Sequence, residues 1–181
     1  MIALPMVLSI HSKNYVNQNR VAITIRPIHL LDNAAIAFII RASLEEFGAN
    51  KPGTVYYDNT TDHLYELFQN HQRCAYYIAE EDGLIIGGAG YFHSDGLDEN
   101  TCELVKMYLS KSSRGKGLGQ QMIAHCMSEA KSNGFTQMYL ETMPELKKAI
   151  QVYEKFGFEY LKGPMGNTGH DGCGIWMLKK I

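Results

Sequence analysis

The chain has 181 residues, enough for one domain with a substantial buried core. Hydrophobic residues make up 45% of it and charged residues 20%, as in an ordinary globular protein, and a net charge of −2 argues against general affinity for nucleic acid. No apolar run approaches the roughly 18 residues that a membrane span needs, and the four cysteines lack zinc-site spacing and indicate reduced thiols in a cytoplasmic protein.

The first twenty residues are set apart by their composition. Residues 1–10 are apolar but lack the basic start and the small-residue cleavage site of a signal peptide. Residues 12–20 are polar and show no period. We therefore interpret residues 1–20 as an N-terminal arm, either loose or forming an added strand, and residues 21–181 as the single folded domain.

The next part of the chain predicts one strand and two helices. Residues 21–26 alternate in polarity, which favours a strand. Asp32 can cap a helix whose apolar positions recur up to Phe47. After a loop, Thr60 or Thr61 can cap a second helix.

A β-hairpin is predicted to follow. Residues 74–80 and 84–93 are rich in apolar and aromatic residues, and the turn at 81–83 ends in glycine. Glycine weakens a strand and often marks a bulge or the close approach of another group. The second strand therefore has either a plain bulge or space for a ligand at its three glycines, Gly87, Gly88 and Gly90.

The most informative stretch is a strand, a glycine-rich turn and a helix start over residues 103–119. Glycines let backbone N–H groups approach an anion, and a helix start adds unpaired N–H groups and a partial positive charge. Such a turn suits a phosphate or pyrophosphate, although a tight connection with solvated cations has the same composition. The spacing excludes a P-loop and a dinucleotide fingerprint. The glycines are Gly115, Gly117 and Gly119, and the cations are Lys111, Arg114 and Lys116.

The last part of the chain predicts three more strands and a helix. The strands are expected at residues 135–142, 158–161 and 174–180. Thr142 and Glu145 have the spacing of a capping box, and the apolar residues that follow share one face of a helix. The expected order of elements is therefore β-α-α-β-β-β-α-β-α-β-β.

Two motifs resemble those of a known family. Arg114, Gly117 and Gly119 form the pattern R-x-x-G-x-G, which resembles the acetyl-CoA motif of the Gcn5-related N-acetyltransferases (GNAT superfamily). Residues 149–158, Ala-Ile-Gln-Val-Tyr-Glu-Lys-Phe-Gly-Phe, resemble that family's late helix. The resemblance implies an α+β fold with a mixed, largely antiparallel central sheet flanked by helices. One departure is Leu146, where many members carry an asparagine that bonds near the cofactor arm.

The resemblance implies an N-acetyltransferase that moves an acetyl group from acetyl-CoA, its cosubstrate, to a primary amine without a metal. Backbone N–H groups of the glycine turn are expected to grip the diphosphate, together with Arg114 and Lys116. Backbone groups at residues 107–109 are expected to line the pantetheine arm and to supply an oxyanion donor. The expected cofactor-binding residues are Met107, Tyr108, Leu109, Arg114, Gly115, Lys116, Gly117, Leu118, Gly119 and Gln120.

Two side chains are candidates for the proton transfers. Glu103 opens the strand beside the cofactor, where the family often uses a carboxylate or a water as the base. The alternative is a sheet-edge glutamate in a salt bridge with Lys106. Tyr153 stands four residues before Gly157, where the family places a tyrosine near the cofactor sulfur, and its phenol can donate a proton at neutral pH. The alternative is a tyrosine of the core.

The acceptor is the least defined part. In the GNAT family the first two helices and their loop form much of the acceptor pocket, so Glu45, Glu46, Tyr56 and Tyr57 are candidate contacts, as is His170 in a glycine-rich loop. Each is equally compatible with an ordinary surface role. We expect a small-molecule amine as partner, with no nucleic acid and no membrane, and a homodimer is compatible with the sequence. The alternatives are a protein amine as acceptor, a non-catalytic acyl-CoA-binding module and a phosphate-anchored nucleotide binder.

Overall fold

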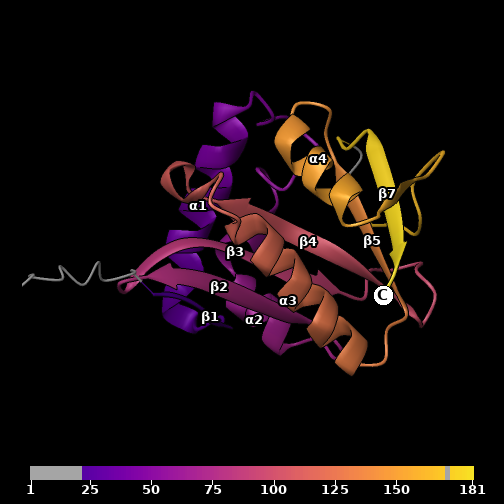
Figure 1. The fold of residues 1–181 in the computed structure, drawn as a ribbon, viewed down its shortest axis with the longest axis horizontal. Helices are drawn as coiled ribbons and strands as arrows, with labels where there is room; N and C mark the ends of the chain where they lie inside the picture. The colour runs from indigo at the N-terminus through magenta and orange to yellow at the C-terminus, as the bar shows by residue number, and fades with distance from the viewer. Residues whose placement is uncertain (1–21, 170–171) are drawn as a thin grey trace, which may run out of the picture.

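The computed structural model describes residues 22–169 and 172–181. They form a seven-stranded sheet in the order β1-β2-β3-β4-β5-β7-β6, with helices on both faces (Figure 1). Every neighbouring pair of strands is antiparallel except β4 and β5, which are parallel. The predicted α+β class, with a mixed and largely antiparallel central sheet, is therefore confirmed. The expected arm at residues 1–20 lies outside the described residues.

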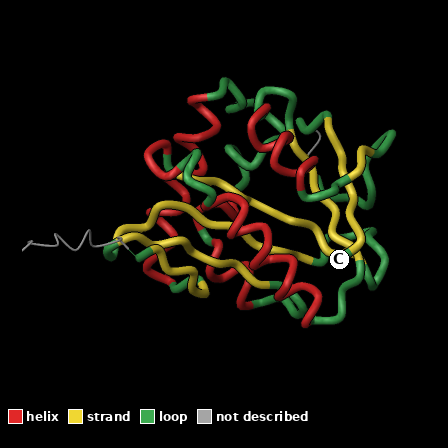
Figure 2. Tube along the Cα trace, in the orientation of Figure 1, coloured by secondary structure: helices red, strands yellow, loops and turns green. Residues whose placement is uncertain are grey.

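The predicted order of strands and helices is also confirmed, with ends that differ by a few residues (Figure 2). The strands are β1 (Ile23–Pro27), β2 (Ala75–Glu81), β3 (Leu84–Phe92), β4 (Thr101–Leu109), β5 (Gln137–Thr142), β6 (Glu159–Tyr160) and β7 (Ile175–Lys180). The helices are α1 (Asn33–Glu46), α2 (Leu64–Gln69), α3 (Leu118–Ser132) and α4 (Lys147–Lys155). Three short 3-10 helices precede α1, α2 and α3, namely η1 (Leu30–Asp32), η2 (Asn59–Asp62) and η3 (Lys111–Ser113).

Asp32 is the N-cap residue of α1 as predicted, but the predicted side-chain hydrogen bond of this cap is wrong. The Asp32 side chain makes no cap hydrogen bond to α1, because its carboxylate accepts hydrogen bonds from Arg26 in β1 and from the backbone N–H of His29. The predicted cap of the second helix is wrong as well. The turn η2 comes first, and its cap is Asp58, which accepts a hydrogen bond from the backbone N–H of Thr60.

The predicted capping box before α4 does not form either. Thr142 extends β5 and pairs with β7, so its backbone is already committed to the sheet. α4 begins after Leu146 without a side-chain cap. Glu145 instead forms an ion pair with Lys51, from the loop after α1. Sheet pairing and a tertiary contact thus replace the local motif that the sequence suggests.

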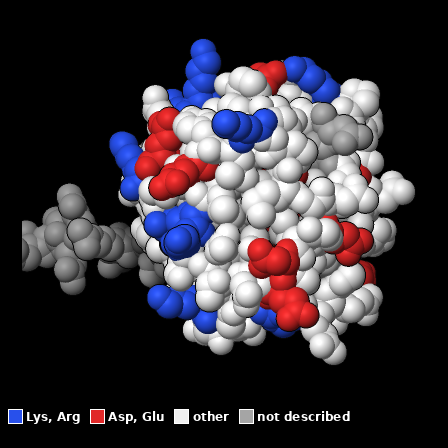
Figure 3. Space-filling model, turned by 90° about the vertical axis from the view of Figure 1, so that its right-hand side faces the viewer, with Lys and Arg blue, Asp and Glu red and all other residues white. Residues whose placement is uncertain are grey.

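Charges on the surface are mixed. On the face shown in Figure 3, lysine and arginine side chains are interspersed with aspartate and glutamate. Among the described residues, no helix is long and apolar enough to cross a membrane. Within the same residues, no three histidine, cysteine, aspartate or glutamate side chains are grouped so that they could hold a metal ion. The expectation of a metal-free reaction stays a prediction.

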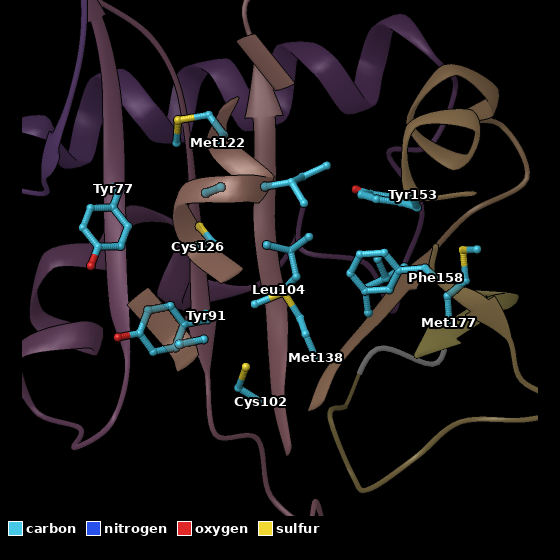
Figure 4. Close-up of a cluster of buried hydrophobic side chains, with 14 of the residues drawn as sticks. Tyr77, Tyr91, Cys102, Leu104, Met122, Cys126, Met138, Tyr153, Phe158 and Met177 are labelled. Carbon is cyan, nitrogen blue, oxygen red and sulfur yellow. The ribbon is translucent and has the colours of Figure 1, made fainter. Parts of the chain in front are cut away.

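Two apolar clusters fill the space on either side of the sheet. α1 and α2 cover one face, where Ile36, Ile40 and Leu64 are fully buried. α3 and α4 cover the other face, where Met122 and Tyr153 belong to one buried cluster (Figure 4). These residues lie at the helical spacing that the sequence displays, because a helix between sheet and solvent buries only one face.

The three glycines of β3 allow close packing within the sheet. A Cβ at Gly88 or Gly90 would meet the ring of Tyr76 at 2.7 Å, and a Cβ at Gly87 would meet Cδ2 of Leu109 at 2.5 Å. None of the three glycines lines the cleft described below. The interpretation as ligand space is therefore wrong. The bulge is confirmed, because the register shifts beside Gly87 in the pairing with β2 and between Gly88 and Gly90 in the pairing with β4, and close approach within the sheet accompanies it.

The sheet opens at its centre. β4 and β5 pair over only three residues of each strand, and the last pair joins Glu103 to Tyr139. Beyond this pair the two strands diverge (Figure 1), while β5 stays paired with β7 along its whole length. Within the described residues, positions 104–109 of β4 therefore have no partner strand on this side.

Candidate active site

A cleft of about 600 Å³ occupies the opening between β4 and β5. Its walls come from both strands, from the turn before α3, from α4 and from the loop after α1. Glu103 and Tyr153 both line it. Most of the predicted cofactor contacts line it too, namely Met107, Tyr108, Leu109, Arg114, Gly115, Gly117, Gly119 and Gln120. The fold thus brings residues that are up to 50 positions apart in the sequence to one site.

The turn before α3 has the backbone of an anion-binding loop. Gly115 and Gly117 have φ angles of 78° and 83°, in the left-handed region that favours glycine. Gly117 is the N-cap residue of α3, and no side chain caps this helix start. A Cβ at either glycine would have no neighbour within 4 Å. The first N–H groups of α3 therefore lie beside open space, where an anion can accept their hydrogen bonds.

Arg114 holds this turn against α1. Its Nε donates a hydrogen bond to the carbonyl oxygen of Leu109 at 2.9 Å. Its terminal nitrogens donate to Oγ of Ser43 and to Oε2 of Glu46, each at 3.0 Å. These contacts fix the turn in place, and they use three of the five N–H donors of the guanidinium that the sequence assigned to a ligand.

The other predicted residues of the turn differ in exposure. Lys116 is exposed and is not among the residues that line the cleft. The Leu118 side chain is buried in the core, so only its backbone can face a ligand. Gly119 lies under Met107, since a Cβ there would be 3.2 Å from Cε of that residue. Gln120 is exposed at the edge of the cleft.

Tyr153 enters the cleft from α4. Its side chain is buried, and its hydroxyl lies 4.0 Å from Sδ of Met107 on β4. The hydroxyl points from α4 toward the central strand (Figure 4). Burial raises the pKa of Tyr153 to about 12, so the phenol keeps its proton at neutral pH. The ring of Tyr153 thus packs in the apolar core, while its hydroxyl faces the cleft.

Glu103 lies where β4 and β5 part. Only 3% of its surface is exposed, and Ser94 donates a hydrogen bond to its Oε2. Burial raises the pKa of Glu103 to about 7. The hydrogen bond from Ser94 opposes this rise, the neighbouring carboxylate of Glu141 adds to it, and the charge of Lys106 opposes it. A carboxyl group that is half ionised near neutral pH is suited to accept a proton.

Sequence reasoning missed the role of Lys106. Its ammonium forms an ion pair with Asp58 at 2.7 Å, so the alternative of a salt bridge between Lys106 and Glu103 is wrong. The side chain is 5% exposed and lines the cleft. The signal was available, because a lysine is rarely buried and this one interrupts an apolar strand.

The acceptor candidates of α1 and its loop do not reach the cleft. The Tyr56 hydroxyl donates a hydrogen bond to Glu45 at an exposed position. Glu46 accepts from the arginine of the glycine turn, and Tyr57 is 60% exposed. None of the four lines the cleft. The fifth candidate, His170, lies outside the described residues.

Other residues contribute to the lining of the cleft. They come from the loop after α1, from β5 and from the loop before β7, and they are Thr54, Val55, Glu141, Thr142 and Cys173. The loop after α1 is held in place by a hydrogen bond from the backbone N–H of Gly172 to the carbonyl oxygen of Gly53 at 2.9 Å. No local motif in the sequence predicts this contact, because the two glycines are far apart in the chain.

Known proteins share both the sequence and the fold. The family model described as the acetyltransferase (GNAT) family matches residues 38–158. The uncharacterized N-acetyltransferase YjgM of Escherichia coli (strain K12) is 39% identical over 158 residues, which cover 86% of this chain and 93% of the relative.

Two solved structures have the same fold at low sequence identity. An acetyltransferase of the GNAT family from Staphylococcus aureus Mu50 has a TM-score of 0.78 at 19% identity, over 88% of this chain and 99% of that chain. The putative acetyltransferase YncA from Salmonella typhimurium, solved with its cofactor acetyl-CoA, has a TM-score of 0.68 at 22% identity, over 88% of this chain and 94% of that chain.

Proposed function

Because the chain belongs to the GNAT family of N-acetyltransferases, we propose that it transfers an acetyl group from acetyl-CoA to the primary amine of a small molecule. The observation that carries this proposal is the cleft between β4 and β5, where the glycine turn, Glu103 and Tyr153 meet. Its volume of about 600 Å³ lies within the range of roughly 300–1,000 Å³ that is typical of small-molecule sites.

The glycine turn fits the diphosphate of acetyl-CoA. The left-handed backbone at Gly115 and Gly117 leaves open space beside the start of α3. An anion there accepts backbone hydrogen bonds and meets the positive end of the helix dipole. Arg114 keeps the turn in position and adds its charge. The acetyl-CoA bound by YncA, which shares the fold, supports the same cosubstrate here.

Glu103 is proposed to take the proton of the acceptor amine. An alkyl ammonium with a pKa near 10.4 loses its proton at neutral pH at a cost of roughly 4–5 kcal/mol, so a base is needed. A base is most effective when its pKa lies near the working pH, and the pKa of Glu103 is about 7. Met107 lies four steps beyond Glu103 along β4, at most about 13 Å away. Over such a distance the proton passes from the amine to Glu103 through at least one water.

The remaining steps use β4 and α4. Acetyl-CoA supplies an acetyl group that is already activated as a thioester. A backbone N–H of residues 107–109 donates a hydrogen bond to its carbonyl oxygen, a contact worth roughly 10²–10³ in rate. As the amine nitrogen bonds to the acetyl carbon, the bond from that carbon to sulfur breaks. Tyr153 gives its phenolic proton to the departing sulfur. The nitrogen, which still carries one proton too many after it bonds to the acetyl carbon, loses that proton to solvent, and Tyr153 regains one from solvent.

A panel of amines tests this proposal. We expect release of CoA thiol when acetyl-CoA is mixed with the protein and a small primary amine. Turnover with peptides or proteins alone would replace the small molecule by a protein acceptor. Binding of acetyl-CoA without turnover of any amine would mean a non-catalytic acyl-CoA-binding module.

Three further expectations stay predictions. They are that residues 21–181 form one domain, that the chain is able to form a homodimer, and that it works in the cytoplasm.

The outer side of α1 and the turn before it expose apolar side chains, with Leu31 at 91% and Phe38 at 73% exposure. Apolar surface of this kind is often buried in an interface, which supports the homodimer.

Acetyl-CoA is expected to raise the melting temperature of the protein. At a concentration of about 100 times Kd, binding to the folded state adds roughly 2.7 kcal/mol to the free energy of unfolding. For a chain of this size that corresponds to an increase of about 5–10 °C. Differential scanning fluorimetry measures it, with ATP as the control ligand. No shift at millimolar acetyl-CoA would contradict the proposed cosubstrate, and an equal shift with ATP would favour a nucleotide binder.

Gly117→Glu is expected to abolish acetyl-CoA binding while the fold survives. The new side chain would extend into the open space beside the turn, where its bulk and negative charge oppose a diphosphate. A left-handed φ costs a non-glycine residue roughly 1–2 kcal/mol. Gly83→Glu is the matched control, because Gly83 has a φ of 78°, has nothing within 4 Å of its Cβ position and lies in the β2–β3 turn. Isothermal titration calorimetry should show binding lost in the first variant alone; equal binding in both would place the diphosphate elsewhere.

A further inference from the structure

β4 carries one extra residue opposite β3. Gly88 pairs with Tyr108 and Gly90 pairs with Val105, so three steps along β4 match two steps along β3. Lys106 lies within this bulge, and its φ of 46° falls in the left-handed region that residues other than glycine rarely adopt. A strained backbone of this kind persists only where the surrounding structure fixes it, and such sites cluster where proteins do chemistry.

The bulge turns Lys106 onto the side of β4 that faces α1 and α2. Strand residues alternate between the two faces of a sheet. Leu104 packs in the cluster beside α3, and Val105 packs in the cluster beside α1 and α2. Regular alternation would return Lys106 to the α3 side, but Met107 packs there instead. Lys106 therefore shares its side of the sheet with Val105. Glu103, two residues before Val105, lies on the same side.

Contacts from three elements fix Lys106. Its Nζ lies 2.7 Å from Oδ2 of Asp58 and donates to Oγ1 of Thr61 at 3.5 Å. The buried hydroxyl of Tyr76 on β2 donates a hydrogen bond to the Lys106 carbonyl oxygen at 2.8 Å. Asp58 is also the cap of η2, which follows the loop after α1. The ion pair thus joins the loop after α1 to the strand that carries Glu103.

Each partner of the ion pair favours the charged form of the other. Burial lowers the pKa of Lys106, and the carboxylate of Asp58 opposes that change. Burial would raise the pKa of Asp58, but the charge and hydrogen bond of Lys106, together with hydrogen bonds from Thr60, hold it at about 2.

Lys106 is the cation that acts on Glu103. Ser94 donates a hydrogen bond to Glu103 from the β3–β4 loop, and Glu141 adds negative charge from β5. Glu103 also interacts with three titratable groups that are neutral at pH 7, Cys102, Tyr139 and Cys173. Within the part of the chain that the structure describes, Lys106 supplies the one positive charge among the groups that act on Glu103.

We propose that Lys106 is a positioning residue for acetyl transfer, which fixes the loop after α1 against β4 through Asp58 and places a positive charge on the side of β4 that carries Glu103. The proposal rests on the proposed function of Glu103 as the base. It also gives a reason for the strained bulge, because regular alternation would bury the lysine in the apolar cluster beside α3. There it would lose both Asp58 and its influence on Glu103.

Lys106→Met tests the charge, since methionine keeps an unbranched side chain without the ammonium. Loss of a nearby cation disfavours a carboxylate and so raises its pKa. In the parent, kcat/KM for the acceptor should fall on the acidic side of about pH 7, where Glu103 becomes protonated. In Lys106→Met this acidic limb of the pH profile should therefore move to higher pH by on the order of half a unit to one unit. The acceptor KM should rise several-fold, with the Kd of acetyl-CoA unchanged. Lys106→Arg should keep the limb in place, as should the exposed control Lys131→Met on α3.

A double variant separates positioning from stability. Asp58→Asn alone leaves a buried ammonium without its partner and should lower the melting temperature. Combining it with Lys106→Met removes that unpaired charge and should restore much of the loss. The acidic limb should shift less in the double variant than in Lys106→Met, because Asp58→Asn removes the negative charge beside the missing cation. A limb that Lys106→Met leaves in its parental position while the melting temperature changes would mean that Lys106 is merely structural.

A titration without turnover keeps the inference distinct from the proposed function. The carboxyl carbon of Glu103 can be followed by NMR in protein labelled with ¹³C-glutamate and assigned by its absence in Glu103→Gln. We expect its midpoint to be higher in Lys106→Met than in the parent. An unchanged midpoint would overturn the inference even if amines are acetylated. Failure to acetylate any amine would overturn the proposed function, while the titration would still report on Lys106.

Discussion

Glu103→Gln is expected to lower kcat/KM for the acceptor amine by about 10²-fold or more above pH 7, the lower part of the range for a general base. Glutamine has the same size and can still accept the hydrogen bond from Ser94, but it cannot take a proton. The pKa of Glu103 is about 7, so the parent should lose activity as the pH falls through that value. The variant should lack this acidic limb. Steady-state rates at saturating acetyl-CoA, measured across the neutral range, give both results.

The same variant is expected to be more stable than the parent at alkaline pH. Burial raises the pKa of Glu103 from its ordinary value of 4.5 to about 7. A carboxyl group with a raised folded-state pKa favours the folded state below pH 4.5 and loses that contribution as the pH rises through 7. The loss corresponds to on the order of 3 kcal/mol. Glutamine does not ionise, so its advantage in melting temperature should grow over this pH range.

The matched control for both measurements is Glu99→Gln. Glu99 lies at an exposed position in the β3–β4 loop, so the same chemical change there should alter neither rate nor stability. Loss of activity together with a gain in stability is difficult to obtain from misfolding. A pH profile that Glu103→Gln leaves unaltered would assign Glu103 a structural role, and the base would then be a water positioned by other groups.

The order of elements could be predicted from the sequence because its signals are local. Helical spacing, the Asp82-Gly83 turn and the glycine turn before α3 each act within a few residues. The helix caps were predicted less well, because a cap competes with tertiary contacts. Thr142, for example, lies in β5, where its backbone pairs with β7.

The environment of the candidate residues could not be predicted, because it depends on strand register and on distant loops. The pKa of Glu103 depends on burial and on Glu141, which comes from another strand. The contacts of Arg114 come from α1, about 70 positions earlier in the chain. The bulge at Lys106 exists only in the pairing of β4 with β3. A lysine within an apolar strand nevertheless marked the place where the local pattern fails, as is typical of a functional site.

Tyr153→Phe is expected to lower kcat by at least tenfold, with the Kd of acetyl-CoA within a few-fold of the parent. Phenylalanine keeps the ring that packs against Phe158 and removes the hydroxyl beside β4. The thiol of CoA has a pKa near 8.5, so it leaves tolerably well without an acid. The loss should therefore lie toward the lower end of the general-acid range of roughly 10²–10⁴, or just below it. Single-turnover rates, which report the chemical step alone, are the measurement of choice.

Stability and pH dependence sharpen this prediction. Among the described residues, the Tyr153 hydroxyl has only the weak acceptor Sδ of Met107, at 4.0 Å, so its removal should cost less than about 1 kcal/mol of folding free energy. Burial raises the pKa of Tyr153 to about 12, so the parent should show no alkaline limb from this residue below about pH 10. Tyr160→Phe is the control, because the Tyr160 hydroxyl lies on the exposed β6 and bonds to Glu154. If Tyr153→Phe turns over at the parental single-turnover rate, Tyr153 is a core residue only, and the departing sulfur takes its proton from water.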